Sequence, residues 1–146
     1  MPSQSNQLFK NPQISSGSWE LVKVLKTPET QWRTRPIKIA DINNDTKPDF
    51  LVMLIHRDGS LPTWKAAVFW MEYSGSNVET ANWTTHVIKW GDGFVGISTF
   101  NGEKWDQCYF EDVDRDGDLD IVANCEEFHT TGFVYIAVVW FENPLI

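Results

Sequence analysis

The sequence has few cysteines, few basic residues and no long apolar run, and each shortage excludes a class of protein. Two cysteines among 146 residues are too few for a disulfide scaffold. Twelve Lys and Arg residues against twenty Asp and Glu give a net charge of −8, so we expect no nucleic acid partner. Because no apolar run reaches the length of a membrane span, we expect no membrane insertion either. The first residues also lack the basic and apolar regions of a secretory signal peptide.

The sequence does contain many apolar side chains and clustered acidic ones. Hydrophobic residues make up 42% of the chain and aromatic residues 14%, which is enough to bury a core in one compact domain. Eight of the twenty acidic residues fall within two short stretches, 41–49 and 112–120. Carboxylates concentrated in this way repel one another, and a bound cation would neutralise them.

The chain repeats itself once. Three segments of the first half match three segments of the second half in the same order, at offsets of 64, 71 and 70 residues. The first match aligns Trp19 with Trp83, the second aligns the two acidic stretches, and the third aligns Trp70 with Trp140. The chain therefore divides into a polar N-terminal extension (1–16) and two repeats (17–75 and 81–144).

Both repeats contain short runs of β-branched and aromatic residues bounded by Gly, Pro, Asn and Asp, a pattern that is typical of strands. Strands are expected near residues 21–25, 37–39, 50–55, 66–71, 86–90, 108–110, 119–123 and 134–141. No stretch sustains a helical period, so we predict an all-β fold with about four strands per repeat. Four strands in a repeat of this length fit one blade of a β-propeller, and a sandwich of two four-stranded sheets is the alternative.

The second acidic stretch has the ligand spacing of a calcium loop. Its carboxylates stand at positions 1, 3, 5 and 9, Gly117 at position 6 permits a sharp turn, and position 7 would offer a backbone carbonyl. Oxygen ligands in this number suit Ca²⁺, which accepts irregular geometry that Mg²⁺ does not. The predicted metal ligands are Asp112, Asp114, Asp116, Asp118 and Asp120.

The first acidic stretch keeps positions 1, 5 and 9 as Asp but departs from this spacing elsewhere. Position 6 is Thr46 in place of Gly, and position 7 carries the positive side chain of Lys47. We expect weaker calcium binding here, through Asp41, Asn43, Asp45, Lys47 and Asp49. For either stretch, the alternative is an acidic turn without metal, in which Asp side chains cap their own backbone.

Three segments together resemble the FG-GAP/VCBS repeat family: the stretch 112–122, Trp83-Thr-Thr-His-Val-Ile88 and Val138-Val-Trp-Phe-Glu-Asn-Pro144. The resemblance covers both repeats and implies propeller blades with calcium loops between their strands. It also favours an extracellular location, where calcium is abundant. Two blades cannot close a ring, so we expect either a homo-oligomer of three or four copies or a piece of a longer propeller.

Two further groups are candidates for a ligand site or a catalytic site. The segment 91–106 is expected to form a loop in which Trp105 stacks on a sugar beside Glu103 and Asp106, the alternative being a packed loop with a core Trp. Acid–base or metal chemistry would fall to Glu126, Glu127 and His129, although solvated loop charges explain that group equally well. Two further residues, Cys108 and Cys125, are expected to be buried free thiols, with a cross-strand disulfide as the alternative.

The sequence therefore predicts a calcium-binding propeller module of two blades that self-associates and serves as a recognition or scaffold unit, with carbohydrate as the expected ligand. One alternative is a sugar-active lyase or dehydratase, or a fragment of one. Another is a purely structural repeat whose only ligand is Ca²⁺.

Overall fold

The computed structural model describes residues 6–25, 33–34, 38–56, 65–91, 100–129 and 131–143. Within these ranges the chain forms strands and no helix, which confirms the all-β prediction. The strands are β1 (Asn6–Lys10), β2 (Glu20–Leu25), β3 (Arg33–Thr34), β4 (Lys38–Ala40), β5 (Asp49–His56), β6 (Lys65–Ser74), β7 (Asn82–Gly91), β8 (Phe100–Glu111), β9 (Asp120–His129) and β10 (Val134–Phe141).

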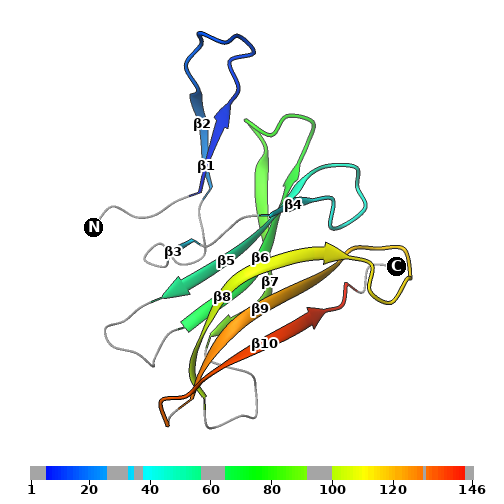
Figure 1. The fold of residues 1–146 in the computed structure, drawn as a ribbon. Helices are drawn as coiled ribbons and strands as arrows, with labels where there is room; N and C mark the ends of the chain where they lie inside the picture. The colour runs from blue at the N-terminus through cyan, green and yellow to red at the C-terminus, as the bar shows by residue number, and fades with distance from the viewer. Residues whose placement is uncertain are drawn as a thin grey trace.

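The strands form three antiparallel sheets (Figure 1). In the first sheet the order is β3–β5–β6–β7, and β4 pairs with a different part of β5 than β3 does. The second sheet has the order β10–β9–β8, and β1 and β2 form a separate hairpin that projects at the top of Figure 1. Within the described part of the chain, none of these sheets closes on itself. The prediction of propeller blades therefore stays a prediction.

The alternation of side chains along β9 explains how its sequence builds a sheet with one buried face. Successive side chains of a strand point to opposite faces. On β9 the side chains of Ile121, Ala123 and Cys125 are buried, and the residues between them are more exposed. The cross-strand partners of these three residues on β10 are Phe141, Val139 and Ala137, which lie on the same face. We call this the inner face of the second sheet.

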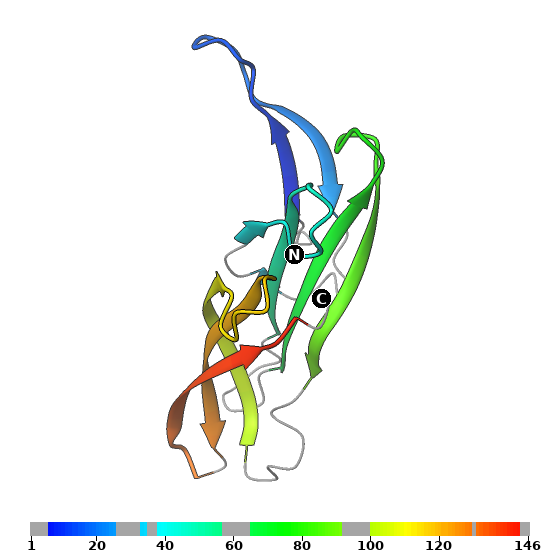
Figure 2. The same cartoon turned by 90° about the vertical axis from the view of Figure 1, so that its right-hand side faces the viewer.

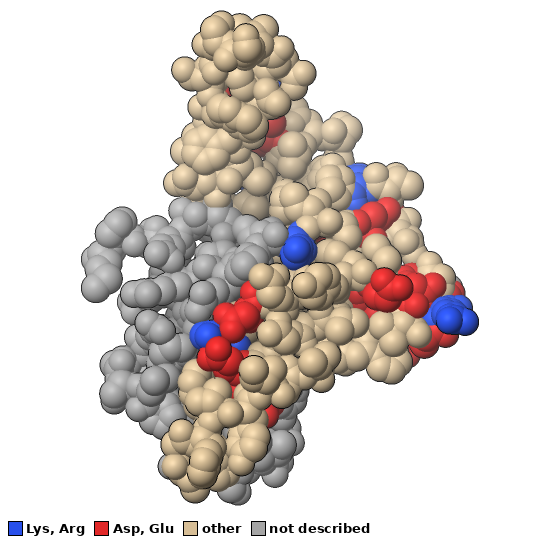
Figure 3. All heavy atoms as spheres, in the orientation of Figure 1, with Lys and Arg blue, Asp and Glu red and all other residues tan. Residues whose placement is uncertain are grey.

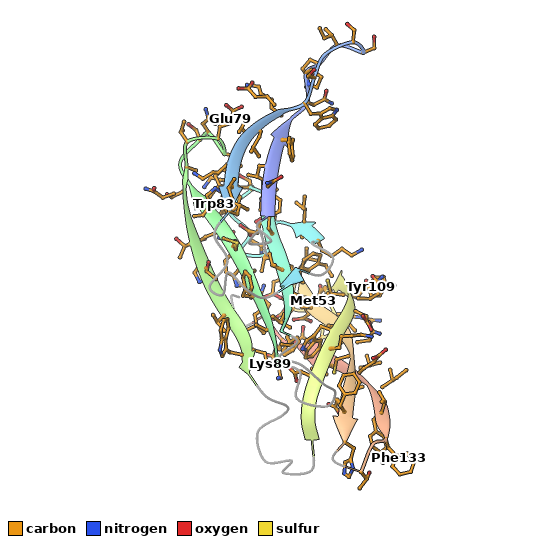
Figure 4. All side chains as sticks on the ribbon, turned by 90° about the vertical axis from the view of Figure 1, so that its left-hand side faces the viewer. Met53, Glu79, Trp83, Lys89, Tyr109 and Phe133 are labelled. Carbon is orange, nitrogen blue, oxygen red and sulfur yellow. The ribbon has the colours of Figure 1, made fainter. Side chains whose placement is uncertain are left out.

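The inner face of the second sheet packs against the first sheet in one shared core. From the first sheet, the side chains of Leu51, Met53 and Val68 are fully buried there. In Figure 4, Met53 lies where β5 approaches the second sheet. The second sheet contributes Trp105, Cys108, Ile121, Ala123 and Cys125 to this core. Apolar burial between the two sheets is therefore the main contact between the two repeats.

The far face of the first sheet is covered by the β1–β2 hairpin. Phe69 and Met71 of β6 are buried on that face, together with Leu25 of β2, and Leu8 of β1 packs against them. Lys23 of β2 also donates a hydrogen bond to the carbonyl oxygen of Ala81. Figure 2 shows the hairpin extending away from the rest of the chain beyond this contact. Strand β1 was not predicted, and it lies within the stretch that we expected to be a polar extension.

The second sheet leaves its other face exposed. Ile136, Val138 and Trp140 of β10 point away from the shared core and are 75%, 74% and 46% exposed. We call this the outer face of the second sheet.

Among the described residues, no helix is long and apolar enough to cross a membrane.

Candidate functional site

The two acidic loops have the same backbone shape. Left-handed φ angles occur at positions 4 and 6 of both loops, at Asn44 (56°) and Thr46 (68°) in the first, and at Arg115 (66°) and Gly117 (103°) in the second. Three of these four residues carry a side chain in a region that L-residues rarely adopt. Their recurrence at matching positions shows that the repeat found in the sequence is also a repeat of loop geometry.

Four hydrogen bonds recur in both loops at matching positions. In the first loop they run from Ile42 N to Asp49 Oδ2 (2.9 Å), from Asp45 N to Asn43 Oδ1 (3.2 Å), from Thr46 N to Asp41 Oδ2 (2.8 Å) and from Lys47 N to Asp45 Oδ1 (2.9 Å). In the second loop they run from Val113 N to Asp120 Oδ2 (3.0 Å), from Asp116 N to Asp114 Oδ1 (3.3 Å), from Gly117 N to Asp112 Oδ2 (3.2 Å) and from Asp118 N to Asp116 Oδ1 (3.2 Å). The alternative interpretation of the acidic stretches, that their side chains cap their own backbone, therefore describes part of what both loops do.

The second loop also gathers three carboxylates. Asp112, Asp114 and Asp116 each offer an oxygen, and these oxygens lie within 4.8 Å of one another. The Oδ1 atom of Asp112 is buried and has no hydrogen-bond partner among the described residues. Partial desolvation, followed by the negative charge of Asp116, raises the pKa of Asp114 above its usual value. Figure 3 shows acidic side chains gathered on the right-hand side of the molecule, where Figure 1 places this loop.

The remaining two Asp residues of the second loop are buried, and one of them, Asp120, holds its end. Both carboxylate oxygens of Asp120 accept backbone amides, Oδ2 from Val113 and Oδ1 from Asn143 at 2.9 Å. Burial alone would raise the pKa of Asp120, but these amides and a hydrogen bond from Trp140 lower it. Asp118 is only 2% exposed. Asp120 therefore clamps the loop to β10, and the three-oxygen group is formed by the other carboxylates.

The first loop offsets part of its negative charge internally. The ammonium group of Lys47 lies 2.8 Å from Oδ2 of Asp45, and this ion pair lowers the pKa of Asp45. Both oxygens of Asp41 accept backbone amides, from Asp45 and from Thr46. Burial raises the pKa of Asp49, which is the equivalent of Asp120. The weaker calcium binding expected for this loop stays a prediction, and the Lys47–Asp45 pair supplies a physical reason for it.

Two side chains that were not among the predicted site residues, Asn143 and Glu72, tie the loops to the rest of the fold. Asn143 donates from its side-chain amide to the carbonyl oxygens of Ile42 (2.8 Å) and Leu119 (3.3 Å), so that it touches both loops. In the first repeat, Glu72 accepts a hydrogen bond from Asn43 at 2.8 Å and lies 3.0 Å from Nε2 of His86. The local signal for Asn143 was its position directly after Trp140-Phe-Glu142, within the segment that resembles the repeat family; its first-repeat equivalent is Tyr73.

The structure contradicts the exposed position that the sugar-binding interpretation needs for Trp105. Strand β8 begins at Phe100, so Trp105 and Glu103 lie within a strand and both are 0% exposed. Strand alternation directs both side chains to the inner face, which packs on the first sheet. Glu103 accepts from the Nε1 of Trp105 at 3.0 Å and from the Nζ of Lys89 at 2.5 and 2.6 Å. In Figure 4, Lys89 lies where β7 approaches the second sheet.

The structure also separates two members of the candidate catalytic group. Because neighbouring residues of a strand point to opposite faces, Glu126 and Glu127 do not converge. Glu126 pairs with Lys104 at 2.7 Å, and Lys104 also lies 3.1 Å from Asp106. Glu127 is buried directly opposite Glu103 in the sheet register. The Nδ1 atom of His129 lies 2.6 Å from the hydroxyl group of Thr131.

Both cysteines are buried free thiols, as expected from the sequence. They do not face each other across the sheet, because Cys108 pairs with Ala123 and Cys125 pairs with Trp105. Burial, followed by the negative charge of Glu127, raises the pKa of Cys125 to about 12, and burial also raises that of Cys108. A protonated buried thiol is a poor nucleophile.

Comparison of the chain with family models, curated proteins and solved structures found no match. The resemblance to FG-GAP/VCBS repeats therefore stays a prediction, and the function has to be argued from the geometry of the loops.

Proposed function

We propose that this chain is a calcium-binding β-repeat module in which the loop 112–120 holds the ion, and that copies of the module assemble into a larger scaffold. The observation that carries the calcium part is the group formed by Asp112, Asp114 and Asp116. Calcium binds oxygen at 2.3–2.6 Å, so two of its ligands are at most about 5 Å apart. The spacing of the three carboxylates, all within 4.8 Å of one another, fits this limit.

The contrast between the loops supports a cation in the second one. Two loops with matching hydrogen bonds differ at position 7, where the first has Lys47 and the second has Asp118. The ammonium group of Lys47 supplies positive charge to its own loop. In the second loop the same position adds a carboxylate, and the buried Oδ1 of Asp112 has no donor among the described residues. An added cation would balance this charge and coordinate that oxygen.

The chemistry of the ligands favours calcium over transition metals. The group offers carboxylate oxygens, which suit hard cations such as Ca²⁺ and Mg²⁺. Mg²⁺ demands near-ideal octahedral geometry, whereas Ca²⁺ accepts the irregular arrangement of a tight loop. The residues present therefore fit calcium best.

We propose a structural role for the bound ion. The loop 112–120 joins β8 to β9, and Asp120 and Asn143 connect it to the end of β10. An ion that binds the folded loop and not the unfolded chain stabilises the fold by mass action. Carbohydrate binding by Trp105 is not part of the proposal, because the side chain has no exposed face. Catalysis by Glu126 and Glu127 is not part of it either, since they lie on opposite faces.

Thermal unfolding in calcium and in chelator tests the calcium part, with isothermal calorimetry to measure binding. We expect calcium to raise the melting temperature of the natural chain. At a calcium concentration of a hundred times Kd, the free energy of unfolding should increase by about 2.7 kcal/mol. Asp116→Ala should remove most of this difference, because it removes one of the three grouped oxygens.

The matched control is Asp45→Ala, the same change at position 5 of the first loop. It removes the partner of Lys47 and should leave the calcium-dependent difference of the second loop in place. An equal calcium effect in the Asp116→Ala variant, or no effect of calcium on the natural chain, would contradict the proposal.

A further inference from the structure

The two repeats differ in how their third long strand is surrounded. Strand β6 pairs with β5 on one edge and with β7 on the other, and Ala66 and Val68 are fully buried. The offset of 70 residues makes β10 the equivalent of β6. Among the described strands, β10 pairs only with β9, and Ile136 and Val138, the equivalents of Ala66 and Val68, are 75% and 74% exposed. In the second sheet β8 takes the place that β3 and β4 share in the first, and no described strand takes the place of β7.

The sequence repeat identifies the strand that would complete the second sheet. The offset of 64 residues makes β2 the equivalent of β7, through the match of Trp19 with Trp83. Strand β7 is the partner of β6. By the same relation, a strand with the sequence of β2 belongs beside β10. Within the described part of the chain, β2 pairs only with β1, so its second edge is open.

The packing of β2 agrees with this assignment. Lys89 of β7 donates to Glu103 on the inner face of the second sheet. Its equivalent on β2 at the offset of 64 is Leu25, which is buried against the far face of the first sheet, among Phe69 and Met71. Strand β2 therefore lies against the first sheet in the way that β7 lies against the second.

One copy of the chain cannot satisfy both positions. Figures 1 and 2 both place the β1–β2 hairpin at one end of the molecule and β10 at the other. A second copy of the chain can supply the strand that reaches β10.

We infer that β2 of one copy pairs antiparallel with the open edge of β10 in another copy and completes its second sheet. The inference rests on the self-assembly in the proposed function and assigns the surfaces that carry it. The contact joins two different surfaces of the chain, so it is a heterologous interface that can repeat from one copy to the next. The copies form a closed ring if the rotation between neighbouring copies closes. Added strand pairing also satisfies the exposed backbone groups of an open edge.

The repeat also predicts the register of the new strand pair. In the first sheet, Glu72 pairs with Thr84 and Trp70 pairs with His86. The same offsets place Glu142 opposite Glu20, and Trp140 opposite Val22. The register shift between Val68 and Phe69 carries over as well, so that Leu25 stands opposite Val138. The side chains of Val22 and Leu25 would then extend the outer face formed by Ile136, Val138 and Trp140. This enlarged apolar face packs on the copy that supplies β2, as the first sheet packs on the second within one chain.

Native mass spectrometry in calcium-containing buffer tests the assembly, with Val138→Lys as the disrupting variant. We expect discrete oligomers of the natural chain and at least about a tenfold loss of oligomer in the variant, because the lysine is buried unpaired at the contact. The control Ile14→Lys changes another strongly exposed apolar residue, in the β1–β2 turn, and should not alter assembly. A monomeric natural chain, or an oligomeric Val138→Lys variant, would overturn the inference.

Disulfide trapping tests the register independently of folding defects in that variant. Glu20→Cys and Glu142→Cys are made in separate chains, mixed and oxidised, so that only a contact between copies can join them. Leu21→Cys replaces Glu20→Cys in the control, because residue 21 points to the opposite face. We expect the first mixture to give covalent heterodimers several times faster than the control mixture, and equal rates would contradict the register.

The inference and the calcium part of the proposed function can fail separately. A Val138→Lys variant that is monomeric yet still binds calcium would show that calcium binding does not depend on assembly. Oligomers that bind no calcium would remove only the calcium part of the proposed function.

Discussion

The side-chain amide of Asn143 donates a hydrogen bond to the carbonyl oxygen of Ile42 at 2.8 Å and so joins positions 101 residues apart in the chain. The same amide reaches Leu119 in the second loop. Asn143→Ala removes both bonds and leaves part-buried carbonyl groups without this donor. We expect a loss of about 1–3 kcal/mol in the free energy of unfolding, measured by urea denaturation. Asn82→Ala, at the exposed start of β7, is the control; equal losses in the two variants would show that Asn143 does not link the repeats.

The residue at position 7 should decide which loop depends on calcium. Asp118→Lys places an ammonium group at the position that Lys47 occupies in the first loop. Its neighbour would be Asp116, the equivalent of Asp45, with which Lys47 forms an ion pair. We expect this variant to lose calcium binding and to unfold at the same temperature in calcium and in chelator. The reverse change, Thr46→Gly with Lys47→Asp, should add a second calcium equivalent in calorimetry. An Asp118→Lys variant that still binds calcium would show that position 7 does not control the site.

The backbone at position 6 predicts opposite effects of substitutions in the two loops. Thr46 is β-branched and has a φ of 68°, whereas its equivalent Gly117 has a φ of 103°. Holding a residue with a side chain in the left-handed region costs about 1–2 kcal/mol of folded-state stability. Glycine avoids this cost but lowers stability by roughly 0.5–1 kcal/mol, because its unfolded chain has more conformational freedom. Thr46→Gly should therefore stabilise the protein by up to about 1 kcal/mol, and Gly117→Ala should destabilise it by about 1–2 kcal/mol. Urea unfolding in chelator measures both changes without a contribution from calcium, and a destabilising Thr46→Gly would contradict the strain argument.

Local patterns in the sequence explain which parts of the fold were predictable. The apolar runs at 50–55 and 134–141 became β5 and β10 because β-branched and aromatic residues favour strands wherever they are placed. The acidic spacing of 112–120 is equally local, so its three-carboxylate group was predictable. The structure adds that Asp120 acts through backbone amides, which spacing alone does not reveal.

Long-range pairing explains what the sequence did not reveal. Strand β1, with the sequence Asn-Gln-Leu-Phe-Lys, has little strand signal and forms by pairing with β2. The first half of β8 is polar and was expected to be a loop, but it pairs with β9 and buries Glu103 against Lys89. Because that ion pair joins two strands, no local pattern indicates it. For the same reason the sequence left open whether Trp105 stacks on a sugar or belongs to the core, and the structure places it in the core.

The buried ion pair between Lys89 and Glu103 should be strongly coupled. Lys89→Met removes the ammonium that pairs with a fully buried carboxylate, and breaking one side of such a pair costs about 3–5 kcal/mol. Adding Glu103→Gln removes the charge while an oxygen remains for Trp105, so the double variant should be more stable than Lys89→Met alone. Urea denaturation of the four members of this double-mutant cycle measures the coupling.

Lys104 provides a control for the buried pair. It pairs with Glu126 and Asp106, which are about a third exposed. Exposed pairs contribute about 0–1 kcal/mol, so Lys104→Met should cost much less than Lys89→Met. Similar losses in the two variants would show that burial does not set the strength of the Lys89 pair.

Glu127 should make the stability of the protein depend on pH. Burial, followed by the negative charge of Glu103, raises the pKa of Glu127 above its ordinary value of 4.5. In the window between 4.5 and that raised pKa, the folded state binds more protons than the unfolded state, so stability falls as pH rises through it. Glu127→Gln cannot ionise and should lose this dependence, which makes it progressively more stable than the natural chain from pH 4.5 upward. Urea unfolding of both chains at pH values from about 4 to 8 measures the difference, with Glu126→Gln on the opposite face as control. A stability difference that stays constant with pH would show that Glu127 is not held in a destabilising environment.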